Sequence, residues 1–147
     1  MKLSTIVFLS SFVLLSFSAC KTSKNIENAN NTTNLVGTKW KLTELYGKPV
    51  ADKINGKEPF LELLETDSQY TATAGCNGIG GTFSILKNGK IKFSQGMSTM
   101  MACENMDVEI QLKKALTLAD NYSVSDNTLS LNKSRMAPLA RFKAIEK

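Results

Sequence analysis

The stretch "TFSILKNGKIKF" (residues 82–93) decides the fold class, because it has the pattern of two short strands joined by a tight turn. A two-residue loop at its Asn-Gly step would put the apolar residues of the two strands on opposite faces. A three-residue loop over residues 87–89, with the glycine in the left-handed region, puts them all on one face. Because a buried face fixes the register of a strand, we expect the three-residue loop. The resulting cross-strand pairs are Phe83 with Phe93 and Ile85 with Ile91.

The rest of residues 35–147 contains further short segments with the pattern of strands. We expect strands within residues 37–47, 60–65, 69–75, 121–126, 128–132 and 139–145. The first of them directs Trp40 inward, and Asp126-Asn127 forms a tight turn. Many short strands with a single helix indicate a mainly β fold, either a small antiparallel barrel-like sheet or a curled sheet.

One α-helix is expected at about residues 106–119, packed across the sheet. Asn105 or Asp107 could cap its first turn. Its apolar residues recur with helical spacing and form one stripe, made of Val108, Leu112, Ala115, Leu116 and Ala119.

The start of the chain predicts export and a lipid anchor. Residues 1–19 have the pattern of a signal peptide, and their apolar stretch is too short for a comfortable membrane span. The "FSAC" step ending at Cys20 resembles a bacterial lipobox, in which the cysteine becomes the lipidated N-terminus. The alternative is an ordinary cleaved signal with an incidental Cys20. Residues 20–34 are polar and are expected to form a flexible tether, which leaves residues 35–147 as one domain. By resemblance to bacterial sorting rules, Lys21 favours the outer membrane, with the domain facing the periplasm.

Directly before the hairpin lies "AGCNGIGGTF" (residues 74–83), whose glycines and cysteine raise two functional possibilities. A phosphate-binding loop needs a lysine where Gly81 stands, and a helix after it where a strand is expected here. A nucleophilic Cys76 normally needs a base, and the chain contains no histidine. We therefore interpret the stretch as a glycine-rich corner that lets the chain turn between two strands.

The cysteines have a structural use. If Cys20 carries lipid, Cys76 and Cys103 remain as an even pair in an oxidising compartment. We expect them to form a disulfide, which would close a loop of about 28 residues and stabilise the domain by about 3–4 kcal/mol. The alternative is two buried free thiols.

The segment "MSTMMAC" (residues 97–103) is rich in methionine. Soft thioethers suit Cu(I), but methionine also fills irregular gaps in a core. We favour the second interpretation, with the methionines packed beside the helix. The sequence therefore predicts neither a metal site nor a cofactor.

Charged residues indicate no further chemistry. The chain has 18 Lys and Arg, 13 Asp and Glu, and a net charge of +5. The basic residues are dispersed, whereas a nucleic-acid-binding face would cluster them. The carboxylate pairs Glu62/Glu65 and Glu104/Asp107 have nothing that makes them converge. We therefore expect no nucleic-acid partner and no enzymatic activity.

A set of short motifs occurs in a recognisable order. The motifs are "GTKWKL" (residues 37–42), "GCN" with its following glycines (75–81), "TMMAC" (99–103), the helix after it and "LSL" (129–131). Together they resemble the META domain family, which includes the heat-shock lipoprotein HslJ, over nearly all of residues 35–147. The resemblance implies a barrel-like β fold with one helix, in an envelope protein without known enzymatic activity. Some relatives are linked to heat shock and to novobiocin resistance.

The resemblance carries no catalytic residues. The family's signature positions fall here on Trp40, Gly75, Cys76, Asn77, Thr99, Met101, Ala102 and Cys103. By resemblance, these residues are structural or belong to an undefined interaction surface.

Two functions are compatible with the sequence. The first is an envelope-anchored, non-enzymatic binding or accessory module in stress or antibiotic tolerance, with an envelope protein or a small ligand as its partner. The second is a carrier or sensor of a small apolar ligand held inside the barrel. An interior filled with side chains, including Trp40 and the methionines, would leave no room for such a ligand.

Overall fold

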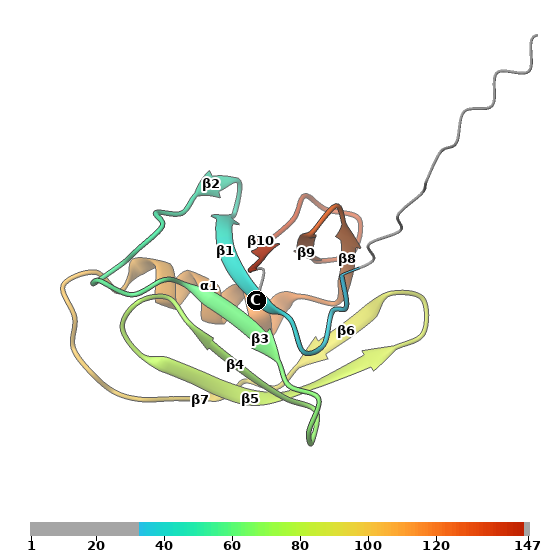
Figure 1. Cartoon of the computed structure of the whole chain (residues 1–147), viewed down its shortest axis with the longest axis horizontal. Coiled ribbons are helices and arrows are strands. Elements are labelled where there is room, and N and C mark those ends of the chain that lie inside the picture. The colour runs from blue at the N-terminus through green and yellow to red at the C-terminus, as the bar shows by residue number, and fades with distance from the viewer. Residues whose placement is uncertain (1–32, 146–147) are drawn as a thin grey trace, which may run out of the picture.

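Strand β1 (Lys39–Leu45) joins the two ends of the domain. In the computed structural model, which describes residues 33–145, β1 pairs on one side with β3 (Phe60–Leu63) and on the other with β10 (Ala140–Ala144). Since β10 is the last strand, this pairing bends the sheet back on itself (Figure 1). The result is a ring of antiparallel strands with one helix, which confirms the mainly β fold that the sequence predicts.

The remaining strands complete the ring. They are β2 (Lys48–Pro49), β4 (Gln69–Thr73), β5 (Gly78–Leu86), β6 (Lys90–Phe93), β7 (Met97–Ser98), β8 (Asn121–Ser125) and β9 (Thr128–Asn132). Their order is β10, β9, β8, β6, β5, β4, β3, β1, with β2 beside β1 and β7 beside β5. Strands β6 and β8 share a single residue pair, Lys90 with Asn121, so the ring is not a uniform barrel.

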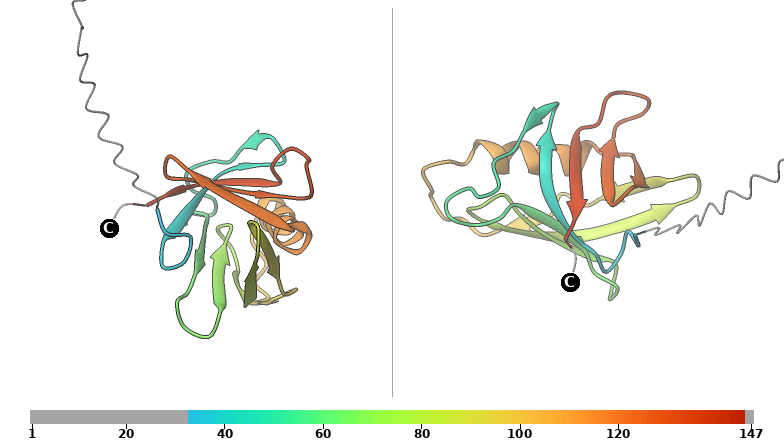
Figure 2. Two further views of the ribbon diagram at one scale, coloured as in Figure 1. Left: turned by 90° about the vertical axis from the view of Figure 1, so that its right-hand side faces the viewer. Right: turned by 45° about the horizontal axis from the view of Figure 1, so that its top comes forward.

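Helix α1 (Asp107–Leu118) lies across the ring and contacts β1, β6 and β9 (Figure 2). Its buried face includes Leu112, Ala115 and Leu116, as the apolar stripe predicts. The expected cap is wrong: the N-cap residue is Met106, and no side chain forms a capping hydrogen bond. At 12 residues, the helix found in residues 33–145 falls short of the length needed to cross a membrane.

The β5–β6 hairpin has the predicted register. Phe83 pairs with Phe93 and Ile85 with Ile91, around a loop of residues 87–89. The glycine of that loop has a φ of 68°, in the left-handed region. Three of the four apolar side chains are buried, but Ile85 is 44% exposed. It lies near the tip of the hairpin, which projects past the rest of the ring (Figure 1).

Part of the expected glycine-rich corner is a strand. Only residues 74–77 make the turn after β4, and β5 begins at Gly78 and pairs with β4 along its first half. The pairing of Tyr70 with Gly81 gives the physical reason. The Tyr70 ring lies over Gly81 and takes the space that a side chain at that position would fill. An aromatic residue that covers a cross-strand glycine supports a strand that glycine alone would weaken.

The interior of the ring is filled. Strand β1 directs Trp40 and Leu42 inward, and a register shift between Leu42 and Glu44 turns Leu45 to the same side. Trp40 is fully buried, and its indole N–H donates to the Leu35 carbonyl at 3.0 Å. The largest fully buried apolar side chains around it are Phe142, Leu42, Leu61, Leu63, Ile91, Leu112, Leu116, Leu129 and Leu131.

Alanine substitutions at two neighbouring glycines of β5 distinguish the effect of side-chain packing on stability from the effect of backbone conformational preference. A Cβ at Gly81 would lie 2.6 Å from Ser94 Oγ and 2.8 Å from Tyr70 Cε1, whereas at Gly80 its nearest neighbour is Tyr70 O at 3.7 Å. We expect Gly81→Ala to lower the free energy of unfolding by about 1–3 kcal/mol through overpacking. Gly80→Ala should leave it unchanged or raise it slightly, because alanine restricts the unfolded chain.

Urea unfolding followed by the fluorescence of Trp40, the single tryptophan of the chain, measures both variants. Equal losses at the two positions would show that the fold has no specific requirement for glycine at Gly81.

Candidate functional site

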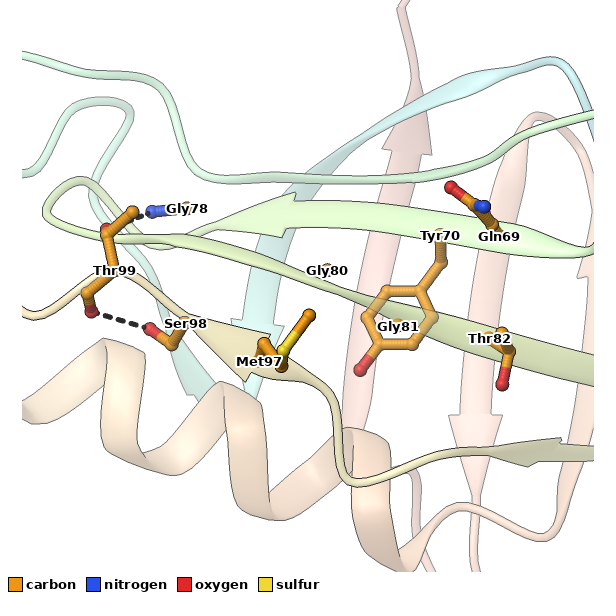
Figure 3. A pocket seen from close by; sticks show the side chains of 9 residues that line it. All are labelled: Gln69, Tyr70, Gly78, Gly80, Gly81, Thr82, Met97, Ser98 and Thr99. Carbon is orange, nitrogen blue, oxygen red and sulfur yellow. Dashed lines mark hydrogen bonds between the residues drawn. The ribbon is translucent and has the colours of Figure 1, made fainter.

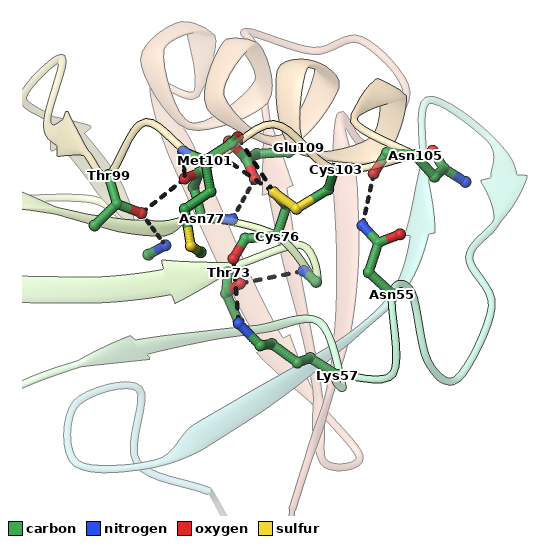
Figure 4. Close-up of a disulfide and its surroundings, with 12 residues drawn as sticks. Asn55, Lys57, Thr73, Cys76, Asn77, Thr99, Met101, Cys103, Asn105 and Glu109 are labelled. Atoms are coloured by element: carbon green, nitrogen blue, oxygen red, sulfur yellow. Dashed lines mark hydrogen bonds between the residues drawn. A yellow bond between two sulfur atoms is a disulfide. The ribbon is translucent and has the colours of Figure 1, made fainter.

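Three segments meet at one end of the sheet, and the first of them is distant in the sequence from the other two (Figure 4). They are the turn after β4, the loop that leads into α1, and the first turn of α1. The turn contributes Cys76 and Asn77, the loop contributes residues 99–105, and the helix contributes Glu109. Most of the family's signature positions therefore gather in one place.

A disulfide links the turn to the loop. Cys76 and Cys103 are joined at an S–S distance of 2.01 Å with their Cα atoms 6.1 Å apart. Lys57 Nζ donates to the Cys76 carbonyl at 3.3 Å, so the segment between β2 and β3 is also held against the bridge. The alternative of two free thiols does not describe this structure.

The buried side chain of Asn77 joins all three segments. Its Oδ1 accepts from Thr99 Oγ1 and from Met101 N, both at 2.8 Å. Its Nδ2 donates to Met101 O at 3.1 Å and to Glu109 Oε1 at 3.0 Å, and its backbone N–H donates to Glu109 Oε2 at 2.7 Å. These bonds use both donors and both acceptor positions of the amide. Thr99 and Met101 thus have a structural role that the motif alone did not explain.

Glu109 is a site residue that the sequence reasoning missed. It is 2% exposed, and no Lys or Arg within residues 33–145 forms a salt bridge with it. Both of its oxygens accept N–H groups of Asn77. It lies in the first turn of α1, where the helix dipole favours negative charge. The spacing could have revealed it, because Glu109 precedes Leu112 by three residues and Leu116 by seven, on the buried stripe.

The other signature positions have separate roles. Gly75 has a φ of 102°, and a Cβ there would collide with the backbone of Ile54. Ala102 is exposed and lines a hollow with Met101. Trp40 is not part of this cluster and lies in the core. Cys20, the predicted lipidation site, lies outside the described residues, as do residues 1–32.

The expectation that the methionines of residues 97–103 fill the core is wrong. Met97 is 85% exposed, Met100 is 98% exposed and Met101 is 49% exposed. The space beside α1 is already filled by the helix's own leucines and by the strands. The segment therefore runs along the outside, and its apolar side chains have few partners within the fold. Exposed apolar clusters of this kind are typical of interaction sites.

A groove of about 580 Å³ lies along β5, between β4 and β7 (Figure 3). Its floor includes Gly78 and Gly80, and Met97 lies beside Gly80. Burial raises the pKa of the Tyr70 hydroxyl, which therefore stays protonated and donates to Ser94 O at 3.3 Å. The nine lining residues are all uncharged, and they are Gln69, Tyr70, Gly78, Gly80, Gly81, Thr82, Met97, Ser98 and Thr99.

The carboxylates that the sequence singled out do not assemble a reactive centre. Within residues 33–145, His, Cys, Asp and Glu side chains form no group of three that could hold a metal ion. Glu62 pairs across the sheet with Lys39 and Thr71, far along the chain from Glu104 and Asp107.

Removing the Asn77 side chain should destabilise the domain strongly. In Asn77→Ala, the buried Glu109 keeps the backbone donor of residue 77 and loses the side-chain donor, and the loop loses its three bonds to the Asn77 side chain. We expect the free energy of unfolding to fall by about 3 kcal/mol or more, because several buried polar groups each lose a hydrogen-bond partner at about 1–3 kcal/mol. Adding Glu109→Gln should recover part of this loss, because a neutral amide is less costly to bury.

Asn105→Ala is the matched control, since Asn105 is exposed and takes part through its backbone carbonyl. Thermal unfolding at neutral pH compares the variants. Equal melting temperatures for Asn77→Ala and Asn105→Ala would contradict the central role of Asn77.

Comparisons with known proteins agree with this fold. The chain is similar to a protein from Burkholderia xenovorans with an NMR structure, with a TM-score of 0.61 and 22% identity over 77% of this chain and 85% of that one. A second NMR structure matches with a TM-score of 0.58 and 20% identity, over 74% of this chain and 90% of that one. A DUF4847 family protein from Bacteroides vulgatus matches with a TM-score of 0.52 and 16% identity, over 75% of this chain and 92% of that one. These likenesses show the fold alone.

No curated protein matches the chain significantly. The family model of the META domain matches residues 33–146, which covers the whole ring and the Cys76–Cys103 site. The chain belongs to the META domain family.

Proposed function

We propose that this protein is a lipoprotein of the bacterial cell envelope whose META domain is a non-enzymatic binding module in stress or antibiotic tolerance. The sequence of residues 1–20 supports the anchor, which would hold the domain at the outer membrane, facing the periplasm. The polar residues up to 34 supply a tether between the lipid and the domain. The absence of histidine from the chain supports a role without catalysis.

The glycine floor of the groove is the observation that carries the binding role. A Cβ at Gly78 would have nothing within 4 Å, and one at Gly80 would meet only Tyr70 O at 3.7 Å. Neither residue has a φ in the left-handed region, so the fold itself does not require glycine at either position. Glycine within a strand nevertheless costs about 0.5–1 kcal/mol relative to alanine. A glycine without an internal reason indicates that something outside the fold approaches the backbone closely.

The walls of the groove suit a protein partner. All of its lining side chains are uncharged, so the partner has to offer apolar or neutral polar groups. Met97 is exposed beside the glycine floor, and its flexible thioether can adapt to the shape of an incoming side chain. We therefore propose an envelope protein that inserts an apolar side chain over Gly78 and Gly80.

The packed interior argues against the alternative of a ligand carrier. The space inside the ring is occupied by Trp40, Phe142 and the leucines around them, all fully buried. A small ligand would instead have to bind in the surface groove, which the following experiment can distinguish.

Filling the groove should remove partner binding without harming the fold. A photo-crosslinking residue at Thr82, an exposed position in the groove, should give a defined protein adduct in living cells. We expect Gly80→Leu to lower the yield of that adduct at least tenfold, because the new side chain occupies the floor. The control is Ser84→Leu, which adds the same side chain at an exposed position of β5 outside the groove.

Mass spectrometry identifies the adduct, and circular dichroism checks that both variants keep the wild-type melting temperature. An adduct yield that Gly80→Leu leaves unchanged would refute the groove as the binding surface. A small-molecule adduct in place of a protein would support the ligand interpretation.

The lipid anchor has its own test. We expect the wild-type chain expressed in bacteria to incorporate labelled palmitate and to fractionate with the outer membrane, and Cys20→Ser to do neither. Cys103→Ser serves as the control, since Cys103 lies in the folded domain. A wild-type protein recovered unlabelled in the soluble periplasmic fraction would show an ordinary cleaved signal.

A further inference from the structure

A second hollow lies over the N-terminal end of α1 and adjoins the glycine-floored groove, with which it shares Thr99. It has a volume of about 350 Å³, and three methionines, Met100, Met101 and Met106, line it. Glu109, which is 2% exposed, also lines it. We call it the methionine pocket. It combines soft sulfur ligands with a negative charge, which the partner-binding role proposed above does not use.

The backbone of the methionine pocket is held in place. Met101 is bonded through both its N–H and its carbonyl to the Asn77 side chain, at 2.8 and 3.1 Å. The disulfide at Cys103 fixes the chain two residues later, and Met106 is the N-cap residue of α1. The thioethers therefore extend from a rigid frame. Since these side chains are not needed to fill the core, the reason for preferring a structural role over a metal-binding one no longer applies.

The lining of the pocket contains one charge of each sign. Glu109 is 2% exposed, and the hydrogen bonds it accepts come from the uncharged amide and backbone of Asn77. No salt bridge compensates it within residues 33–145. Lys113, one turn further along α1, also lines the pocket and opposes a cation. With one carboxylate and one ammonium group the lining has no net charge, so it opposes a divalent ion more than a monovalent one, and the thioethers have to supply the attraction.

Thioether sulfur selects among cations. It is a soft ligand that suits Cu(I), whereas Zn²⁺ and Cu(II) sites use imidazole or thiolate ligands. This chain has no histidine, and the cysteines of the site are joined in a disulfide. We propose that the methionine pocket binds Cu(I) through the thioethers of Met100, Met101 and Met106, with the Glu109 carboxylate supplying the compensating charge.

The proposal can be tested with Ag(I), a soft monovalent ion that is stable in air. The full chain, purified in detergent micelles with ¹³C-labelled methionine methyl groups, is titrated with silver nitrate and followed by NMR. We expect one equivalent of Ag(I) to shift the methyl signals of Met100, Met101 and Met106. The signals of Met97 and Met136, which are exposed elsewhere, should stay in place.

Substitutions supply the matched controls. We expect Met101→Leu and Met106→Leu each to weaken Ag(I) binding at least tenfold, and Met136→Leu to leave it unchanged. Lys113→Gln should tighten binding several-fold by removing the opposing charge, and Glu109→Gln should weaken it about tenfold. Should Glu109→Gln fail to fold, the Lys113→Gln variant still tests the electrostatic part.

Anaerobic competition with a colorimetric Cu(I) chelator extends the measurement to copper. Binding of Cu(I) that Met101→Leu reduces and Met136→Leu does not would support the proposal. Equal shifts of all methionine methyl signals, or no saturable shift, would overturn it, because either result means that the pocket has no preference for the ion.

Discussion

The hydrogen bonds of Asn77 are the constraint on which the organisation of this domain's functional end depends. One side-chain amide connects the turn after β4, the loop before α1 and the first turn of the helix, and each of its polar atoms is used. The loop has few buried apolar side chains, so hydrophobic packing alone does not fix its path. The Cys76–Cys103 disulfide joins two of the same segments but acts differently. It restricts the unfolded chain, whereas Asn77 sets the geometry of the folded one.

Backbone pairing around the ring is continuous on one side and nearly interrupted on the other, where the helix packs. Pairing of β1 with β10 gives a long seam between the first and last strands, whereas β6 and β8 meet at one residue pair. Helix α1 contacts strands on both sides of that interruption and buries its leucines there. Packing against the helix thus replaces backbone pairing between β6 and β8. The segment that leads into the helix runs along the outside of the ring.

The sequence predicts the elements well where burial alone decides them. The register of the β5–β6 hairpin follows from the need to bury Phe83, Phe93 and Ile91, and the strand and helix bounds differ from the expected ones by a few residues at most places. The errors arise where the deciding neighbour is distant in the sequence. Glycines disfavour strands, and only the contact with Tyr70 shows why Gly81 lies in one.

At the candidate site, too, the sequence predicts some features and misses those that depend on contacts distant in the sequence. Pairing Cys76 with Cys103 follows from a count of cysteines once Cys20 is set aside for the lipid, but the roles of Thr99 and Met101 depend on an amide more than twenty residues away in the chain. Methionine is apolar, so its type suggests burial, and its exposure follows from the space that the helix already occupies. Glu109 is charged, so its type suggests exposure, although its spacing from Leu112 and Leu116 places it on the buried stripe. In both cases the residue type suggests the wrong degree of burial, and the position of the residue in the folded domain determines it.

The disulfide also determines what happens when a protease cleaves the chain. It encloses β5, β6 and β7 in a single covalent cycle that includes the exposed loop between β5 and β6. A protease that cleaves that loop opens the cycle but releases no fragment, because both new ends stay attached through the sulfur bridge. The exposed loop between β5 and β6 is thus a place where the chain can be cut once without dividing the molecule.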